Sequence, residues 1–185
     1  MIKTIYFLTS NKNKFEEAKL ILPNIKQLNI DLPEIQELDA KKIIKEKIKA
    51  AYQHKKANFI IEDTSLYLKN LNGLPGPLIK WFIESIGPEG IFKMAKSFNC
   101  FEAEAITIVA YATSKNKIHF FEGKISGTIV KPKILSSLRW DSIFKPSGYQ
   151  KTFAEMSRKE KTAISMRGAA FAKLREYLYS ELNSL

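Results

Sequence analysis

β-rich apolar runs alternate with segments of helical periodicity along almost the whole chain, and this alternation limits the fold more than any other feature. The first unit is typical. Residues 2–8 predict a strand, and apolar residues at near-helical spacing from Phe15 to Leu22 predict a helix that ends at Pro23. A short strand at 25–30 follows. Strands that alternate with helices around one core predict an α/β fold.

The middle of the chain repeats this pattern. Asp39 is placed to cap a helix that extends to Tyr52, and residues 58–61 predict a buried strand that runs into the acidic pair Glu62 and Asp63. After the turn-rich stretch NGLPGP, an amphipathic segment extends through Phe82. Acidic groups at the end of a strand would be well placed for chemistry.

The second half adds antiparallel strands and the last helices. A second helix after the turn-rich stretch spans Pro88 to about Phe98, and residues 105–113 and 118–130 predict a hairpin across the polar SKNK turn. The hairpin makes the predicted sheet mixed. A capping box at Ser157 starts a helical region that continues to about Leu182. With 185 residues and no linker, we expect a single domain over 1–185.

Cysteine usage and hydropathy exclude several classes of protein. Cys100 is the single cysteine, so no intramolecular disulfide can form, and the two histidines do not suggest a zinc site. No apolar run approaches the roughly 18 residues that would suggest a membrane span, and the opening residues do not resemble a secretory leader. We therefore expect a cytoplasmic protein without a membrane partner.

The formal net charge of +11 indicates attraction to polyanions, including nucleic acid and phosphorylated metabolites. The excess comes from 26 lysines against four arginines, whereas proteins that read nucleic acid favour the planar arginine fork. Because the lysines are spread along the chain, a solvated basic surface is favoured over a specific nucleic-acid interface.

Three groups of residues are candidates for a functional site. The first is TSNKNK at 9–14, where a strand ends and a helix begins with Lys14 in reach. Free backbone N–H groups and the helix dipole would hold phosphate there, although Ser and Asn are also ordinary helix caps.

The second group is acidic: Glu34, Glu37, Glu62 and Asp63. Carboxylate oxygens together with substrate phosphates are the usual ligands of Mg²⁺, although Asp63 before Thr64 also fits a turn.

The third group combines lysines with an aromatic residue. It comprises Lys80, Lys145, Gly148, Lys151 and Lys161, and its lysines would neutralise a triphosphate. Any single lysine is nevertheless more often a surface residue. Trp140 followed by Asp141 offers a stacking face next to a hydrogen-bond acceptor, as a purine pocket needs, although a half-buried core Trp is the commoner case.

Seven blocks of the sequence resemble, in order, those of the inosine triphosphate pyrophosphatase family, closest to its archaeal and eukaryotic type. They extend from the first strand to the last helix. The blocks are TSNKNK, IDLPEIQ at 30–36, EDTSL at 62–66, GLPGPLIKWF at 73–82, SGTIVKP at 126–132, FKPSGYQKTFAEM at 144–156 and EKTAISMR at 160–167.

The resemblance implies an elongated mixed sheet flanked by helices, with two lobes around a central nucleotide cleft, and a homodimer. It implies Mg²⁺-dependent hydrolysis of ITP, dITP and XTP to the monophosphate and pyrophosphate, which cleanses the nucleotide pool. Asp63, Lys14 and Lys80 would be catalytic, and Glu34 and Asp63 would bind the metal, with Glu62 in support. The substrate would contact Thr9, Ser10, Asn11, Lys14, Thr64, Lys80, Trp140, Asp141, Lys161, Ser165 and Arg167.

The chain departs from the family pattern on the base side. Leu138 and Arg139 replace an aromatic-glycine pair, and Met166 replaces the histidine of Ser-His-Arg. A further family lysine, in the helix after Glu34, aligns equally with Lys45, Lys47 or Lys49. Pyrophosphate release is therefore better supported than the purine preference. The alternative is a nucleotide-binding homologue with reduced activity or altered base specificity, and a basic nucleic-acid-binding module is a third.

Overall fold

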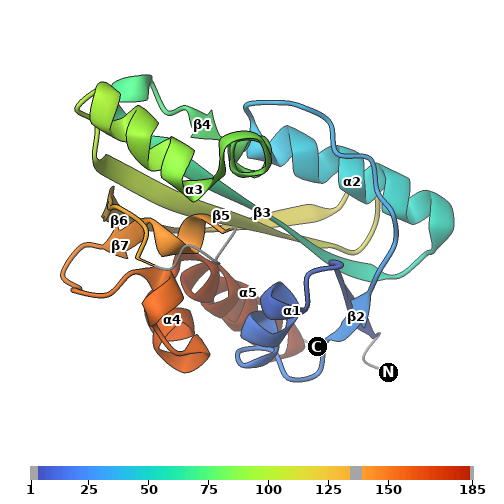
Figure 1. Ribbon diagram of the computed structural model, residues 1–185. Coiled ribbons are helices and arrows are strands. Elements are labelled where there is room, and N and C mark those ends of the chain that lie inside the picture. Colours follow the sequence, from blue (N-terminus) through green and yellow to red (C-terminus); the bar gives the residue numbers. More distant parts are fainter. Residues whose placement is uncertain (1–3, 134–138, 184–185) are drawn as a thin grey trace.

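The computed structural model describes residues 4–133 and 139–183 and has a mixed sheet between two layers of helices (Figure 1). The strand order is β2-β1-β3-β5-β6-β7, with β4 paired to β3 beside this path. β1 is parallel to both β2 and β3, and every later pairing is antiparallel. The predicted mixed α/β fold is confirmed.

The N-terminal unit supplies the parallel part of the sheet. Strand β1 (Ile5–Leu8) leads into helix α1 (Lys12–Lys19), and β2 (Lys26–Leu28) returns beside β1. Helix α2 (Ala40–His54) begins after Asp39, whose carboxylate accepts a hydrogen bond from the Lys41 amide at 2.8 Å. The predicted cap is confirmed.

Long antiparallel strands form the centre of the sheet. β3 (Asn58–Leu68) pairs along its length with β5 (Glu102–Ala112), and β5 forms the predicted hairpin with β6 (Ile118–Ile129). After β3 come a 3₁₀ turn, η1 (Lys69–Leu71), and the short strand β4 (Pro75–Gly76).

Helix α3 (Ile79–Ser97) consists of two helical pieces on either side of Gly87, whose φ of 66° and ψ of 177° are not helical. A residue without a side chain adopts this left-handed φ readily, and Pro88 then starts the second piece with a fixed helical φ. The two segments expected from the sequence are therefore both present.

The last third of the chain is built from short elements. The 3₁₀ turn η2 (Trp140–Ser142) precedes β7 (Phe144–Pro146), and η3 (Phe153–Glu155) precedes helix α4 (Arg158–Ile164). Ser157 and Glu160 form the predicted capping box. The chain breaks at Ser165, so the predicted helical region consists of α4 and α5 (Met166–Asn183). None of the described helices is both long and apolar enough to cross a bilayer.

Helices α2 and α3 cover one face of the sheet, and α1, α4 and α5 cover the other (Figure 1). One core cluster packs α2 on the sheet, around Ile44 and Ile48. A second packs α1 and α5 on the opposite face, around Phe7 and Phe171. The third joins α3, β7 and η3 at the far end of β3 and β5, around Phe144. The first two clusters support one lobe and the third supports the other.

Candidate active site

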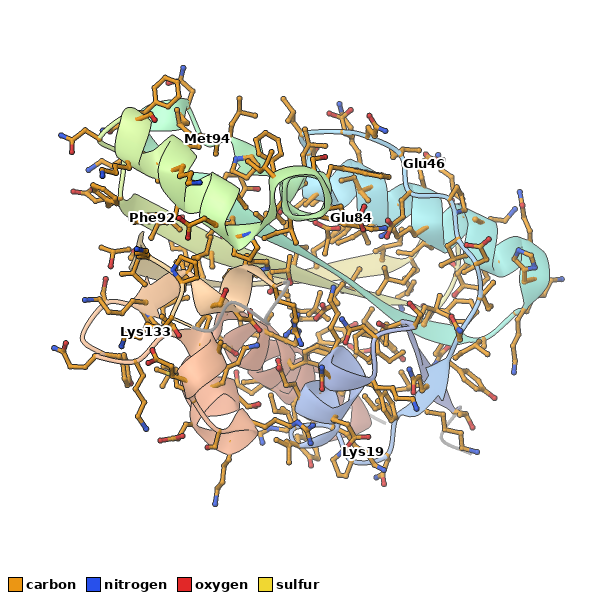
Figure 2. The ribbon with its side chains drawn as sticks, in the orientation of Figure 1. Lys19, Glu46, Glu84, Phe92, Met94 and Lys133 are labelled. Atoms are coloured by element: carbon orange, nitrogen blue, oxygen red, sulfur yellow. The ribbon has the colours of Figure 1, made fainter. Side chains whose placement is uncertain are left out.

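A cleft of about 1070 Å³ lies between the two lobes. This is the upper end of the range for pockets that bind small molecules. One wall comes from the lobe that contains α1 and α2, and the other comes from α3 and η2. Strand β3 forms the floor. Its lining residues are Leu8, Thr9, Ser10, Asn11, Lys14, Asn29, Ile30, Asp31, Leu32, Glu34, Lys47, Ile61, Glu62, Thr64, Ile79, Lys80, Trp81, Ile83, Glu84, Arg139, Trp140, Asp141 and Arg167. Figure 2 shows the side chains and labels Glu84 of α3.

The first turn of α1 borders this cleft. The Asn11 side chain accepts hydrogen bonds from the amides of Asn13 and Lys14 at 3.0 and 3.2 Å, and the Thr9 hydroxyl accepts one from the Asn11 amide at 3.1 Å. The capping role of Asn11 is therefore confirmed. Thr9, Ser10, Asn11 and Lys14 line the cleft, so capping does not exclude a role in binding.

Glu34 connects the two walls. Its carboxylate lies 2.9 Å from Lys47 Nζ of α2 and 2.6 Å from Lys80 Nζ of α3. Burial would raise the pKa of Glu34, but hydrogen bonds and charge from Lys80 and Lys47 lower it to about 2. Both lysines therefore hold Glu34 in its ionised form.

Lys47 is the lysine of α2 that faces the cleft. Its side chain is 13% exposed, and its ammonium group reaches Glu34. Lys45 is exposed to solvent, and Lys49 pairs with Glu46 on the outer surface. Sequence alone left these three positions equivalent, because the choice depends on how α2 is rotated on the sheet.

The prediction that a strand ends before Glu62 and Asp63 is wrong. β3 continues to Leu68, because Glu62 to Leu68 pair with residues 103–109 of β5. Both acidic residues therefore lie in the middle of a strand, where successive side chains project to opposite faces. Glu62 lines the cleft and joins a buried ionic network, whereas Asp63 is not among the lining residues.

Asp63 has an unusual electrostatic environment. Burial raises its pKa to about 6, the charges of Lys14 and Lys47 oppose this rise, and the charges of Glu62 and Glu34 add to it. In the described part of the chain its carboxylate accepts a long hydrogen bond of 3.5 Å from the Ser65 hydroxyl and forms no ion pair. A buried carboxylate without an ion pair is a group that a cation would stabilise.

Glu34 and Asp63 fit a magnesium ion on chemical grounds. Mg²⁺ prefers carboxylate oxygens and is usually held by one or two of them, with waters and substrate phosphates completing its shell. No group of three or more His, Cys, Asp or Glu suited to a metal occurs among the residues that the structure describes. A Mg²⁺ ion at this place would therefore depend on waters and substrate phosphates for most of its ligands.

Behind the cleft, a chain of alternating charges links α1, β3, α5 and α4. Lys14 Nζ lies 2.9 Å from Glu62, whose carboxylate accepts from Arg167 Nε at 2.7 Å and Nη2 at 3.1 Å. Arg167 also pairs with Glu17, which lies 3.2 Å from Lys161 Nζ. Burial would raise the pKa of Glu62, but Arg167 and Lys14 lower it to about 2. Each buried charge thus has an opposite partner, without which its burial would be costly.

Glu17 is a member of this network that the sequence reasoning missed. It is 4% exposed and bonds to both Arg167 and Lys161, so it connects α1 with α4 and α5. The available signal was its position three residues after Lys14, which puts both side chains on one face of the helix.

The base-side candidates fall into two groups. Trp140 and Asp141 line the cleft. The Trp140 ring also packs edge-on against Phe144, with 5.7 Å between the ring centroids, so it belongs both to the cleft and to the core. Lys161 and Ser165 lie behind the cleft: Lys161 Nζ is 2.9 Å from Asp141 Oδ2, and the Ser165 hydroxyl accepts from the Gly168 amide at 3.1 Å.

The remaining candidates are placed as follows. Thr64 lines the cleft and shares a hydrogen bond of 2.8 Å with Thr107. Met166 is 1% exposed and belongs to the core cluster around Phe144. Lys151 pairs with Glu160 at the surface, and Glu37 pairs with the exposed Lys42. Leu138 lies outside the described residues.

The fold and the cleft together define a mixed α/β protein with a basic and acidic pocket suited to a compact, highly charged anion. The chain belongs to the Ham1 family, whose model matches residues 5–177. It is 42% identical to the inosine triphosphate pyrophosphatase of Schizosaccharomyces pombe, over 99% of both chains. It is also 42% identical to the protein of that name from Saccharomyces cerevisiae, over 95% of both chains. Both relatives are fungal, so the eukaryotic type is confirmed.

A solved structure agrees with the fold. The Ham1 protein from Coxiella burnetii superposes with a TM-score of 0.81 at 21% identity, covering 97% of this chain and 100% of that one. The expected elongated fold with two lobes is therefore confirmed.

Proposed function

We propose that this protein hydrolyses non-standard purine nucleoside triphosphates (ITP, dITP and XTP) to the monophosphate and pyrophosphate. The observation that carries the proposal is a cleft with Lys14, Lys47 and Lys80 around carboxylates, in a chain 42% identical to a curated inosine triphosphate pyrophosphatase. Phosphoryl transfer depends mainly on positioning and charge stabilisation, which is what such residues supply.

The phosphates would be bound from both walls. On one side Thr9, Ser10, Asn11 and Lys14 surround the N-terminus of α1, where the helix dipole favours negative charge. Lys47 of α2 adds a charge to this wall, and Lys80 of α3 approaches from the opposite wall; each now pairs with Glu34. A triphosphate would replace Glu34 as the partner of these lysines and so release its carboxylate.

Glu34 and Asp63 would hold Mg²⁺. When bound, the ion supplies positive charge to the phosphate oxygens and lowers the pKa of a coordinated water. With a pKa of about 6, Asp63 is mostly ionised at neutral pH and carries the negative charge that the role requires. Water attacks the α-phosphorus, the bond between this phosphorus and the bridging oxygen breaks, and pyrophosphate leaves.

The base would lie against η2. Trp140 offers an aromatic face, and Asp141 accepts a hydrogen bond from N1–H of a 6-oxopurine. Lys161 holds Asp141 from behind, and Arg167 holds Glu62 beneath the phosphate side. Ser165 supports this arrangement by fixing the turn between α4 and α5.

A homodimer and a cytoplasmic location complete the proposal. Both rest on the resemblance of the sequence blocks to the inosine triphosphate pyrophosphatase family.

The test is a panel of nucleoside triphosphates with separate detection of pyrophosphate and orthophosphate, with and without Mg²⁺. The proposal expects pyrophosphate from ITP or XTP at a higher kcat/KM than from ATP. A protein that binds ITP but releases neither product would be the nucleotide-binding homologue instead.

A further inference from the structure

Arg139 stands at the entrance to the base side of the cleft. It immediately precedes η2 in an extended conformation and lines the cleft with a side chain that is 43% exposed. Its Nη2 lies 3.1 Å from Oδ2 of Asp141. The guanidinium is therefore held beside the carboxylate that the proposed function assigns to the purine.

Asp141 is fixed from behind by a buried lysine. The same Oδ2 atom lies 2.9 Å from Lys161 Nζ, which is held in turn by Glu17. Burial would raise the pKa of Asp141, but the charges of Lys161 and Arg139 lower it on balance. Asp141 is thus an ionised acceptor in a fixed position.

Both members of the pair keep unused hydrogen-bonding capacity. Within the described part of the chain, the Asp141 carboxylate bonds to Lys161 and Arg139 through Oδ2 and leaves Oδ1 available. Arg139 uses Nη2 of its planar fork for this pair. A guanidinium offers five N–H donors and no acceptor, whereas an ionised carboxylate only accepts. The pair therefore presents a row of donors next to an acceptor.

A 6-oxopurine has the complementary edge. Its N7 and O6 are acceptors, and its N1–H is a donor, so that acceptors stand next to a donor. Adenine reverses this pattern at position 6, where it carries an amino donor, and its N1 is an acceptor. Arginine pairs with O6 and N7 through both arms of its fork.

We propose that Arg139 is a specificity-determining residue whose guanidinium donates to O6 and N7 of a 6-oxopurine while Asp141 Oδ1 accepts from N1–H. The inference rests on the proposed function and deepens it, because it names the residue that reads the base. An amino group at position 6 meets donors, and N1 of adenine meets an acceptor. ATP is therefore rejected by two mismatches.

An ordinary surface ion pair is the plain alternative, and the surroundings of the pair argue against it. Surface pairs lie between two solvated side chains, whereas Asp141 is 8% exposed and its partner borders a cleft. A residue that only neutralised Asp141 would duplicate Lys161, which already does so from the buried side.

The test compares ITP and ATP for the wild-type protein, Arg139→Ala, Arg139→Lys and the control Arg158→Ala. Arg158 is an exposed arginine at the start of α4 and does not line the cleft. Two quantities are measured for each protein: kcat/KM with pyrophosphate detection, and Kd for the α,β-imido analogues of both nucleotides in Mg²⁺, which cannot be cleaved at the reacting bond.

Arg139→Ala is expected to lower the ITP-to-ATP ratio of both quantities by about 5- to 100-fold, the range for losing one bidentate base contact. Arg139→Lys keeps the charge but loses the fork, so it should also lower the ratio. Arg158→Ala should leave it unchanged. Unchanged ratios in Arg139→Ala, a wild-type ratio in Arg139→Lys, or an equal fall in Arg158→Ala would each overturn the inference.

The two measurements separate the inference from the proposed function. If the analogue affinities depend on Arg139 as expected but no pyrophosphate is released, the inference holds and the proposed hydrolysis fails. If the wild-type protein releases pyrophosphate from ITP, but neither ITP-to-ATP ratio changes when Arg139 is replaced, the hydrolysis holds and the inference fails.

Discussion

Asp63 differs from the other acidic residues around the cleft in the pKa that its environment produces. Glu34 and Glu62 have lysine or arginine partners that lower their pKa to about 2. Asp63 has no such ion pair among the described residues, and burial raises its pKa to about 6. Asp63 therefore carries a charge that no ion pair in the described part of the chain neutralises, whereas Glu34 and Glu62 are paired.

Replacement of Asp63 by Asn is expected to lower kcat by about a hundredfold or more, because the charge needed at the reacting phosphate is lost. The fold should persist, since the change removes no ion pair and keeps the side chain's shape. Steady-state kinetics on ITP and circular dichroism would measure both effects. Glu104→Gln on β5, outside the cleft, is the matched control and should keep its rate. A near-normal rate in Asp63→Asn would exclude its assigned role.

Asp141 makes a separate prediction about stability and pH. Its pKa is lowered in the folded protein: burial raises it, but Lys161 and Arg139 more than offset that effect. A carboxyl group with a lowered folded-state pKa stabilises the protein above its unfolded pKa of about 4, and this stabilisation is lost as the pH falls further. Asp141→Asn should therefore cost about 3 kcal/mol at pH 7, because Lys161 loses one of its two partners, and less at pH 3, where the carboxyl of the unfolded chain is already largely protonated.

Urea unfolding of both proteins at the two pH values measures this difference. A destabilisation of equal size at pH 3 and pH 7 would show that Asp141 does not act through its charge.

At the scale of elements, the segment between β2 and α2 joins the two walls of the cleft. Glu34 in this segment bridges Lys47 of α2 and Lys80 of α3. The lysines proposed to bind phosphate are therefore occupied in the free protein, and an incoming polyanion has to compete with a carboxylate for them.

Glu34→Gln is expected to tighten the binding of metal-free tripolyphosphate about tenfold, because two lysines lose a competing partner, while Mg²⁺-dependent turnover falls. Isothermal titration calorimetry in EDTA measures the first effect. Glu37→Gln removes a similar pair, with the exposed Lys42, from the same segment and should change neither quantity. Weaker tripolyphosphate binding in Glu34→Gln would contradict the proposed exchange of partners.

The close packing of α5 on β6 is a second feature at this scale. A Cβ added at Gly123 would lie 2.0 Å from the Met166 carbonyl oxygen and 2.7 Å from the Ala170 nitrogen, both in the backbone of α5. Such an approach needs glycine, because neither backbone can yield without displacing Arg167 from its carboxylates.

Gly123→Ala is therefore expected to destabilise the protein by roughly 3 kcal/mol. Thermal and urea unfolding give the change. Ser126→Ala on the same strand is the control: its side chain is exposed to solvent, so the cost should be small. An equal effect of both substitutions would argue against the tight α5–β6 contact.

At the scale of the whole molecule, local signals in the sequence predicted which helices and strands form. Pairing between distant segments determined where some of them end. Three features that depend on residues close in sequence were predicted correctly: the helix cap at Asp39, the β5–β6 hairpin and the capping box at Ser157. The end of β3 was placed too early, because its continuation depends on pairing with β5.

The same limit applies to the site. The polar turn at 9–14, Glu34 and Trp140 could be selected from the sequence, and Thr9, Ser10, Asn11 and Lys14 of the turn line the cleft with Glu34 and Trp140. Glu17 was missed, because its partners are some 150 residues away along the chain. Lys47 could not be separated from its neighbours without the rotation of α2 on the sheet. Side chains whose roles depend on several elements become visible only once those elements are assembled.

The whole cleft, with cationic side chains on both walls, is arranged for a substrate whose phosphates are held together while the bond to the α-phosphorus breaks. The measurement that tests this most directly is the identity of the first phosphorus-containing product from ITP in Mg²⁺. We expect pyrophosphate and IMP in equal amounts from the earliest time points, and no reaction in EDTA. Orthophosphate and IDP as the first products would contradict the proposed function.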